Sequence, residues 1–186
     1  MSAMRAVFRL LNRFFMVPVF RLGLGPLMVN PLTGYIMVLR TIGHKSGKVR
    51  YVPVNYAVDG GCIYCLAGFG KSSHWYRNML ADPRVEAILP GGAVFGKAEA
   101  VPDPAISLKL GRKILQNAGF AGFFAGVNPL NCTDEQLGNV LKTEILIRIR
   151  PEGIGSGPVD PGGWGWVLPW VIGVGLFVAV AAFMAE

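Results

Sequence analysis

Short segments with the character of β-strands follow one another through most of this chain, separated by glycine-rich turns. They are rich in valine, isoleucine and tyrosine, and turns such as Asp59-Gly60-Gly61 stand between them. Strands joined by such tight turns pair in antiparallel fashion, and about six of them close best into a small barrel. We therefore expect a mainly β (α+β) fold, a closed or half-closed barrel of about six antiparallel strands. The predicted strands cover residues 35–41, 50–58, 62–67, 85–89, 94–101 and 144–150.

Short helices are expected between some of these strands. Asp103 precedes a proline, which suits the first position of a helix, and Thr133 with Gln136 forms a capping-box pattern. Another helix is expected to begin after Ser72 or Ser73. With so few helices, the sheet dominates the expected fold.

The C-terminal end of the chain is strongly apolar. Residues 164–184 form a run of 21 residues without a charge, and hydrophobic residues make up 52% of the chain. About 20 apolar residues in a helix can cross a bilayer core of roughly 30 Å. Trp164, Trp166 and Trp170 lie at the start of the run, where indole rings favour lipid headgroups. We therefore expect a single transmembrane helix, with a buried core helix as the alternative.

A stretch rich in glycine and proline precedes this run and is typical of a flexible linker. The folded domain is thus expected to end near Arg150. The expected organisation is an N-terminal basic amphipathic segment at 1–30, the barrel domain at 31–150, the linker at 151–163 and the transmembrane helix at 164–184.

The N-terminal segment carries arginines at a helical spacing. Arg5, Arg9 and Arg13 recur every four residues, with apolar side chains between them. A helix would carry these arginines in one stripe, which suits the surface of an anionic membrane. A helix packed on the folded domain with its basic stripe exposed is nearly as good an interpretation.

The net charge of +7 does not by itself indicate nucleic-acid binding, because no module for that purpose is recognisable. Basic residues beside membrane segments favour the cytoplasmic side, so we expect a membrane protein whose folded domain lies there. Three cysteines imply no closed disulfide framework, and two isolated histidines give no metal site.

The most informative motif lies between the first two predicted strands, at residues 40–50. Gly43 and Gly47 can adopt positive φ and bring backbone N–H groups close to a ligand. Such a turn suits a phosphate or a carboxylate, although a solvated basic hairpin would have the same composition. The side chains that can contact the anion are Lys45, Ser46, Lys48 and Arg50.

Further motifs extend this pattern along the chain. In order they are Thr41-x-Gly43-x-Lys45-Ser46-Gly47-Lys48-x-Arg50, Val52-Pro53-Val54, Asp59-Gly60 with Tyr64, Gly68-x-Gly70, His74-Trp75-Tyr76-x-Asn78 and Asp82-Pro83-x-Val85. Together they resemble the deazaflavin (coenzyme F420)-dependent nitroreductase and quinone reductase family, whose fold is a split β-barrel related to FMN-binding proteins.

The resemblance implies binding of coenzyme F420 and use of its reduced form as a hydride donor. The cations and Ser46 would hold the phosphate and the oligoglutamate tail, and the backbone around Ala67 and Gly68 would lie against the ring. Trp75 would pack on the ring or shape the mouth of the pocket, although core packing explains it equally well. The residues assigned to the cofactor in this way are Lys45, Ser46, Lys48, Arg50, Pro53, Ala67, Gly68, His74 and Trp75.

Two departures from the family pattern keep FMN and haem open as alternative cofactors. His44 stands where the family usually carries arginine, and the loop after Gly68 is shorter. We expect His44 to be a surface residue of the turn without a role of its own.

The implied reaction is hydride transfer to an electron-poor acceptor, a quinone or a nitroaromatic compound. Phe120, Phe123 and Phe124 stand in the region where relatives carry substrate-lining tyrosines, which favours a lipid-soluble acceptor such as a menaquinone. The proton would come from water or from a tyrosine, the candidates being Tyr56, Tyr64 and Tyr76.

Other functions fit the same features. A membrane-tethered protein could bind a flavin, deazaflavin or haem without turnover, and an FMN-dependent oxidase would use the same anion site. Membrane lipid is an expected partner of any of these proteins, and barrels of this kind often form homodimers.

Overall fold

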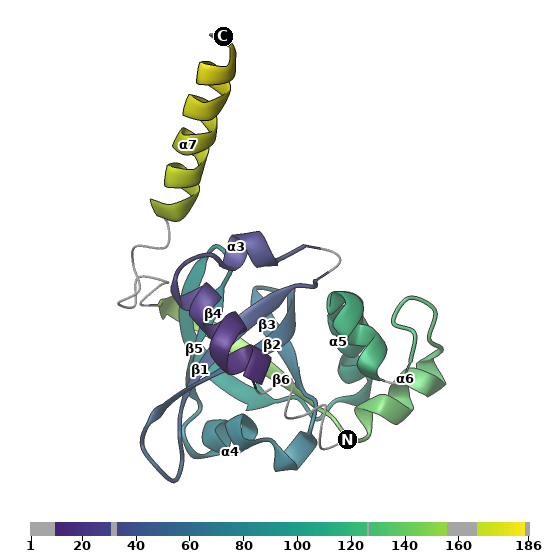
Figure 1. Ribbon diagram of the computed structural model, residues 1–186. Helices are drawn as coiled ribbons and strands as arrows, with labels where there is room; N and C mark the ends of the chain where they lie inside the picture. The colour runs from purple at the N-terminus through teal and green to yellow at the C-terminus, as the bar shows by residue number, and fades with distance from the viewer. Residues whose placement is uncertain (1–9, 31–32, 126, 156–166, 185–186) are drawn as a thin grey trace.

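The computed structural model describes residues 10–30, 33–125, 127–155 and 167–184, and a closed β-barrel forms its centre (Figure 1). The order around the barrel is β1-β2-β3-β6-β5-β4, and every neighbouring pair is antiparallel. The predicted barrel of six antiparallel strands is confirmed. Its strands are β1 (Ile36–Ile42), β2 (Val49–Asp59), β3 (Cys62–Ala67), β4 (Arg84–Leu89), β5 (Gly92–Ala100) and β6 (Ile145–Ile154).

Side chains fill the barrel, because alternate residues of each strand point inward. Met37 and Leu39 of β1, Cys65 of β3 and Ile147 of β6 are fully buried there. A ligand site must therefore lie on the outside of the barrel or at one of its ends.

The wall of the barrel is split beside β2. This strand pairs with β1 over residues 49–55, but its ladder with β3 covers only residues 56–59. The last residues of β3, Leu66 and Ala67, pair with β6 instead. The first half of β2 and the end of β3 thus face each other without sheet hydrogen bonds, which leaves backbone groups available to a ligand.

β6 does not stop near Arg150 but continues to Ile154, so the predicted linker begins too early. Pro151 fits inside this strand because it lies opposite Gly96, next to a β-bulge where a missing N–H is tolerated. A side chain on Gly96 would collide with the carbonyl oxygen of Arg150, so the close approach of the strands requires glycine. Residues 156–163 of the predicted linker lie outside the described residues.

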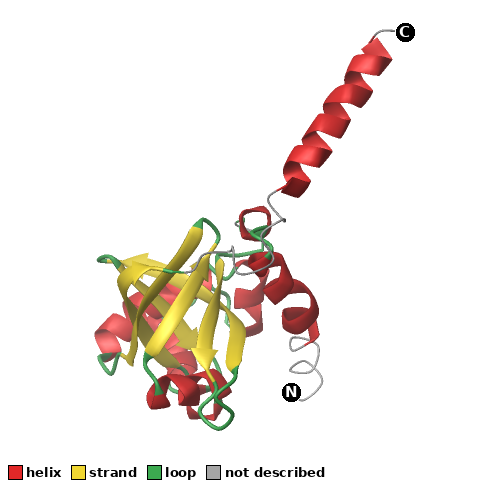
Figure 2. Cartoon of the chain, turned by 90° about the vertical axis from the view of Figure 1, so that its left-hand side faces the viewer, coloured by secondary structure: helices red, strands yellow, loops and turns green. Residues whose placement is uncertain are grey.

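The predicted helices are present around the barrel (Figure 2). Asp103 caps α5 by accepting hydrogen bonds from two backbone N–H groups of its first turn. Thr133 and Gln136 form the predicted capping box at α6. Ser73 takes the N-cap position of α4, though its side chain makes no capping hydrogen bond. These helices are α4 (His74–Ala81), α5 (Pro104–Gln116) and α6 (Asp134–Leu141).

The N-terminal segment packs on the barrel. Met16 and Phe20 are buried against Val38 of β1 and Ile88 of β4. Of the two interpretations of the basic segment, the described part supports the packed helix; Arg5 and Arg9 lie outside the described residues. The segment consists of η1 (Asn12–Met16), α2 (Val17–Arg21) and α3 (Gly25–Met28).

A last helix, α7 (Val167–Met184), points away from the barrel (Figure 1). It covers most of the predicted transmembrane segment, and residues 164–166 of that segment lie outside the described residues. Within the described ranges, no helix has the length and apolarity needed to cross a membrane. The prediction of a membrane-spanning helix at 164–184 is therefore not supported.

Candidate functional site

The turn between β1 and β2 folds into a compact loop. The N–H groups of Ser46 and Gly47 both donate to the carbonyl of Gly43, and the N–H of Gly43 donates to Lys48. Gly47 has φ +63°, a conformation that disfavours side chains. The predicted turn is thus present, but Gly43 does not have the expected positive φ. The backbone N–H groups of the turn that were expected to face a ligand donate within the turn instead, so a ligand would be held by the side chains.

Ser46 lies at the centre of this loop. Its Oγ is 3.4 Å from Nη2 of Arg50 and 3.4 Å from the N–H of Lys48. A Cβ on Gly43 would come within 2.8 Å of the same oxygen, so the glycine makes room for the serine hydroxyl. The structure brings Ser46, Lys48 and Arg50 together, as predicted.

The basic side chains of the loop are exposed to solvent and can bind an anion. Lys45, Lys48 and Arg50 all face solvent, and in the described part of the chain no carboxylate forms an ion pair with them. Other basic residues, such as Arg148 and Lys109, are paired with acidic side chains. The loop therefore has a concentration of uncompensated positive charge suited to a polyanion.

His44 is not the idle surface residue that we predicted. Its backbone N–H and its imidazole both contact the side-chain oxygen of Asn78 in α4. The amide nitrogen of Asn78 donates to the buried hydroxyl of Thr41, with 3.2 Å between the two atoms. The turn is thereby fastened to α4, so the position of the cations is fixed by a buried amide.

Pro53 lies in a groove on the outside of β2. The groove has a volume of about 240 Å³ and is bounded by η1, β2 and η3 (Gly119–Ala125). Leu11, Phe15 and Phe120 line it together with Pro53, so its wall is mainly apolar. Pro53 thus lies in an apolar groove only a few residues after the basic loop.

Ala67 and Gly68 lie across the split from this part of β2. Ala67 is fully buried and pairs with Ile145, whereas Gly68 is exposed. The side chain of Trp75 packs into the barrel core, in agreement with the core alternative weighed for it. His74, the first residue of α4, is exposed.

Glu144 lies beside the candidate site, and the sequence did not reveal it. It immediately precedes β6, and its Oε1 lies 3.6 Å from the place that a Cβ on Gly68 would occupy. Burial raises the pKa of its carboxyl to about 7. A lone glutamate before an apolar strand carries no recognisable signal, and only the pairing of β3 with β6 brings it beside Gly68.

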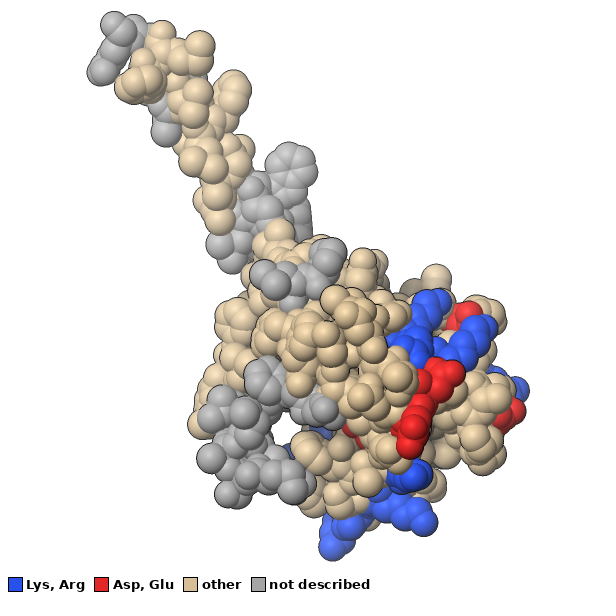
Figure 3. All heavy atoms as spheres, turned by 90° about the vertical axis from the view of Figure 1, so that its right-hand side faces the viewer, with Lys and Arg blue, Asp and Glu red and all other residues tan. Residues whose placement is uncertain are grey.

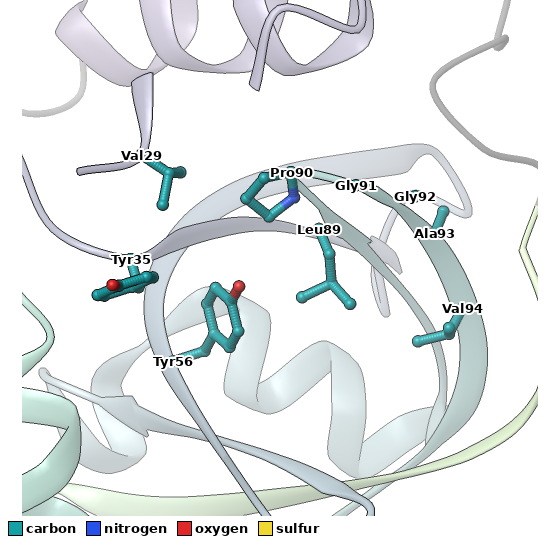
Figure 4. Close-up of a pocket in the computed structure, with 9 residues that line it drawn as sticks. All are labelled: Val29, Tyr35, Tyr56, Leu89, Pro90, Gly91, Gly92, Ala93 and Val94. Atoms are coloured by element: carbon teal, nitrogen blue, oxygen red, sulfur yellow. The ribbon is translucent and has the colours of Figure 1, made fainter. Parts of the chain in front are cut away.

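The candidate tyrosines do not meet at one site, although Tyr56 and Tyr64 lie on the paired strands β2 and β3. Tyr64 is buried beneath α5, and Tyr76 is buried in the core beside the barrel. Tyr56 lines a pocket of about 530 Å³ formed with Tyr35 and the turn between β4 and β5 (Figure 4). This pocket lies where β1 begins, at the opposite end of the barrel from the basic loop.

The Tyr56 hydroxyl points into this pocket (Figure 4). Burial raises its pKa, and the nearby Tyr35 adds to the shift. A phenol with a raised pKa keeps its proton at neutral pH and can donate a hydrogen bond to a ligand. Of the predicted proton donors, Tyr56 is the one that lines this pocket.

Comparison with known proteins completes the description of the site. The model of the F420H(2)-dependent quinone reductase family matches residues 21–123, more than half of the 186 residues. Among solved structures, Rv2991, a conserved hypothetical protein from Mycobacterium tuberculosis, has 22% identity and a TM-score of 0.47, with 64% of this chain and 74% of that chain covered. An F420 reductase has 20% identity and a TM-score of 0.41, with 67% and 91% covered. HutZ, a heme storage protein from Vibrio cholerae, has 13% identity and a TM-score of 0.45, with 74% and 88% covered.

Proposed function

We propose a function on the premise that this chain belongs to the F420H(2)-dependent quinone reductase family. The chain is accordingly an oxidoreductase that depends on coenzyme F420. We propose that it transfers a hydride from the reduced coenzyme to a lipid-soluble quinone. When bound, the coenzyme supplies the hydride, and the protein holds it and the acceptor in position.

The basic loop at residues 43–50 is the observation that carries this proposal. Three exposed cations and the Ser46 hydroxyl surround one turn, and Asn78 fixes that turn to α4. A phosphate followed by glutamates is a polyanion, and arginine and lysine side chains bind such groups through charge-assisted hydrogen bonds. The residues present therefore fit the anionic tail of F420.

The split in the barrel wall fits the ring of the coenzyme. Pro53 lies on one side of the split, and the exposed backbone of Gly68 lies on the other. Gly68 has no side chain to keep a flat ring at a distance, and among the described residues beyond its chain neighbours it is Oε1 of Glu144 that comes near its missing Cβ. The ring would lie against this backbone while the tail reaches the basic loop.

The apolar groove beside Pro53 fits the acceptor. Leu11, Phe15 and Phe120 line it, and these side chains would bind the apolar part of a quinone. Because Pro53 belongs both to this groove and to the predicted coenzyme site, the acceptor would bind next to the ring.

Contact with a lipid surface is the second part of the proposal. Leu10, Leu11, Phe14 and Phe15 are exposed on the N-terminal segment, and many described side chains of α7 are exposed and apolar. Figure 3 shows a face of the molecule on which the charged side chains gather at the right and at the bottom, away from α7. Transfer of these exposed apolar side chains from water into a lipid surface lowers the free energy.

Sedimentation with anionic phospholipid vesicles tests the lipid contact. The full chain should sediment with the vesicles, and a chain ending at Pro161 or carrying Phe14→Ser and Phe15→Ser should do so less. Equal amounts of all three proteins in the supernatant would contradict the lipid proposal.

The choice of cofactor is tested separately. Equilibrium titrations of the purified protein with F420, FMN and haem should give the tightest binding for F420, and added salt should weaken it. Preferential binding of FMN or haem would contradict the proposed function.

A further inference from the structure

Glu144 is partly buried without a partner in the part of the chain that the structure describes. Among the described residues it forms no hydrogen bond and no ion pair. An ionised carboxyl removed from water without a partner is unfavourable, and the group adapts by keeping its proton. With a pKa near 7, a large fraction of Glu144 is neutral at physiological pH.

The charged groups of the neighbouring segments do not alter the raised pKa of Glu144. Lys142 donates to Asn139, and Arg148 on β6 is bound by Glu99. Lys71 in η2 (Gly70–Ser72) is exposed, as is His74 at the start of α4. Burial is the cause of the raised pKa of Glu144, and no neighbouring charge contributes to it.

The segment that carries Gly68 is held against Glu144 by close backbone packing. A side chain on Gly70, which has φ +50°, would collide with the carbonyl oxygen of Thr143. The turn after β3 therefore cannot move away from the residue before Glu144 without losing this contact. A ring lying on the backbone of Gly68 would fill the space beside the carboxyl.

We propose that Glu144 donates the proton that accompanies the hydride in the reduction of the acceptor. This inference rests on the proposed function, because it assumes that the ring lies on Gly68. Glu144 also lies outside residues 21–123, the segment that matches the family model.

The chemistry balances with the reactants already named. Reduction of a quinone to a hydroquinone takes two electrons and two protons, and a hydride supplies both electrons and one proton. The O–H bond of the Glu144 carboxyl breaks to give the second proton to a quinone oxygen. The resulting carboxylate would regain a proton from water, and oxidation of the coenzyme would return one proton to water, so nothing else is consumed.

The predicted tyrosine donors are less well placed. Tyr64 and Tyr76 are buried in apolar clusters. Tyr56 borders the split, but its hydroxyl points into the pocket beside the turn between β4 and β5 (Figure 4). Glu144 is the acid that adjoins the exposed backbone of Gly68.

Proton uptake on binding is the first test. A ring that covers Gly68 removes more water from the carboxyl and strengthens its hold on the proton. Calorimetry of F420 binding at pH 7, in buffers of different ionisation enthalpy, should show uptake of a fraction of a proton by the full-length protein. Glu144→Gln should abolish that uptake, and Glu135→Gln, which changes an exposed glutamate on α6, should leave it unchanged.

The pH profile of quinone reduction is the second test. The kcat/KM of the unchanged protein should fall as pH rises above about 7, since the donor of the free protein loses its proton. The fall in kcat should occur at higher pH, because the bound ring strengthens the hold of Glu144 on its proton. Glu144→Gln should lower kcat by roughly 10²- to 10⁴-fold and remove that fall, while Glu144→Asp should restore part of the rate.

The outcomes separate the two proposals. If F420 binds but proton uptake and the pH profile are the same with and without Glu144, the role of Glu144 is overturned and the proposed function stands. If the unchanged protein does not bind F420 at any pH, both are overturned.

Discussion

The side-chain oxygen of Asn78 lies 2.9 Å from Nδ1 of His44 and 3.1 Å from its backbone nitrogen, so one amide of α4 holds the turn between β1 and β2. Asn78 is almost fully buried, and its amide nitrogen donates to Thr41. The orientation of the basic loop thus depends on a residue that does not face the proposed ligand.

Replacing Asn78 by alanine should therefore affect both stability and binding. It leaves the Thr41 hydroxyl without a donor and frees the loop, which should cost about 1–3 kcal/mol in the free energy of unfolding. F420 affinity should fall as well, because the cations are no longer held in place. Denaturant unfolding and a binding titration measure the two effects. Asn139→Ala, at an exposed position, is the control, and equal behaviour of the two variants would argue against a fastening role for Asn78.

Removing Lys48 and Arg50 together tests the anion site itself. The double alanine variant should bind F420 more weakly by about 2–4 kcal/mol, because two charge-assisted contacts are lost. Its binding should also depend less on salt concentration. The control replaces Lys97 and Lys109, which pair with Glu152 and Asp59 elsewhere on the surface. An unchanged affinity in the Lys48 and Arg50 variant would exclude these residues from the site.

Phe20→Ala tests whether the N-terminal segment belongs to the folded domain. Phe20 is 1% exposed and packs against Val38 and Ile88. Loss of a buried aromatic side chain should lower the free energy of unfolding by about 3–5 kcal/mol. Phe14→Ala, at a largely exposed position of the same segment, should change it little. If both variants were as stable as the unchanged protein, the segment would not be part of the core.

The pH dependence of stability tests the environment of Glu144 without any ligand. The pKa of its carboxyl is raised from 4.5 to about 7 in the folded protein, so the folded state binds this proton more tightly than the unfolded state. The resulting stability is complete below about pH 4.5 and is lost as pH rises through about 7. Glu144→Gln should remove this loss, which amounts to about 3 kcal/mol. Unfolding curves between pH 4 and pH 9 measure it, and parallel pH profiles for both proteins would contradict the assignment.

The strands and the capped helices could be predicted because their signals are local. Alternating side chains and glycine turns located the strands, and Asp103 and Thr133 marked helix starts that the structure confirms. The end of β6 could not be predicted in this way, because Pro151 reads as a linker residue until its bulge opposite Gly96 is known.

The candidate site was partly predictable for the same reason. Ser46, Lys48 and Arg50 are neighbours in the sequence, so the turn that joins them was visible from the residues alone. The hydrogen bond of His44 with Asn78 and the position of Glu144 beside Gly68 join segments far apart in the chain. They depend on how α4 and β6 meet the barrel, which no local pattern encodes.

Anaerobic turnover with a quinone tests the central claim most directly. The full-length protein is mixed with reduced F420, a menaquinone analogue is added, and the absorbance of the oxidised deazaflavin is followed. The account predicts that this absorbance recovers at a rate proportional to protein concentration and that the Lys48 and Arg50 variant is slow at low coenzyme concentration. Tight binding of reduced F420 with no recovery after quinone addition would contradict it, because the protein would then hold the coenzyme without passing its hydride to a quinone.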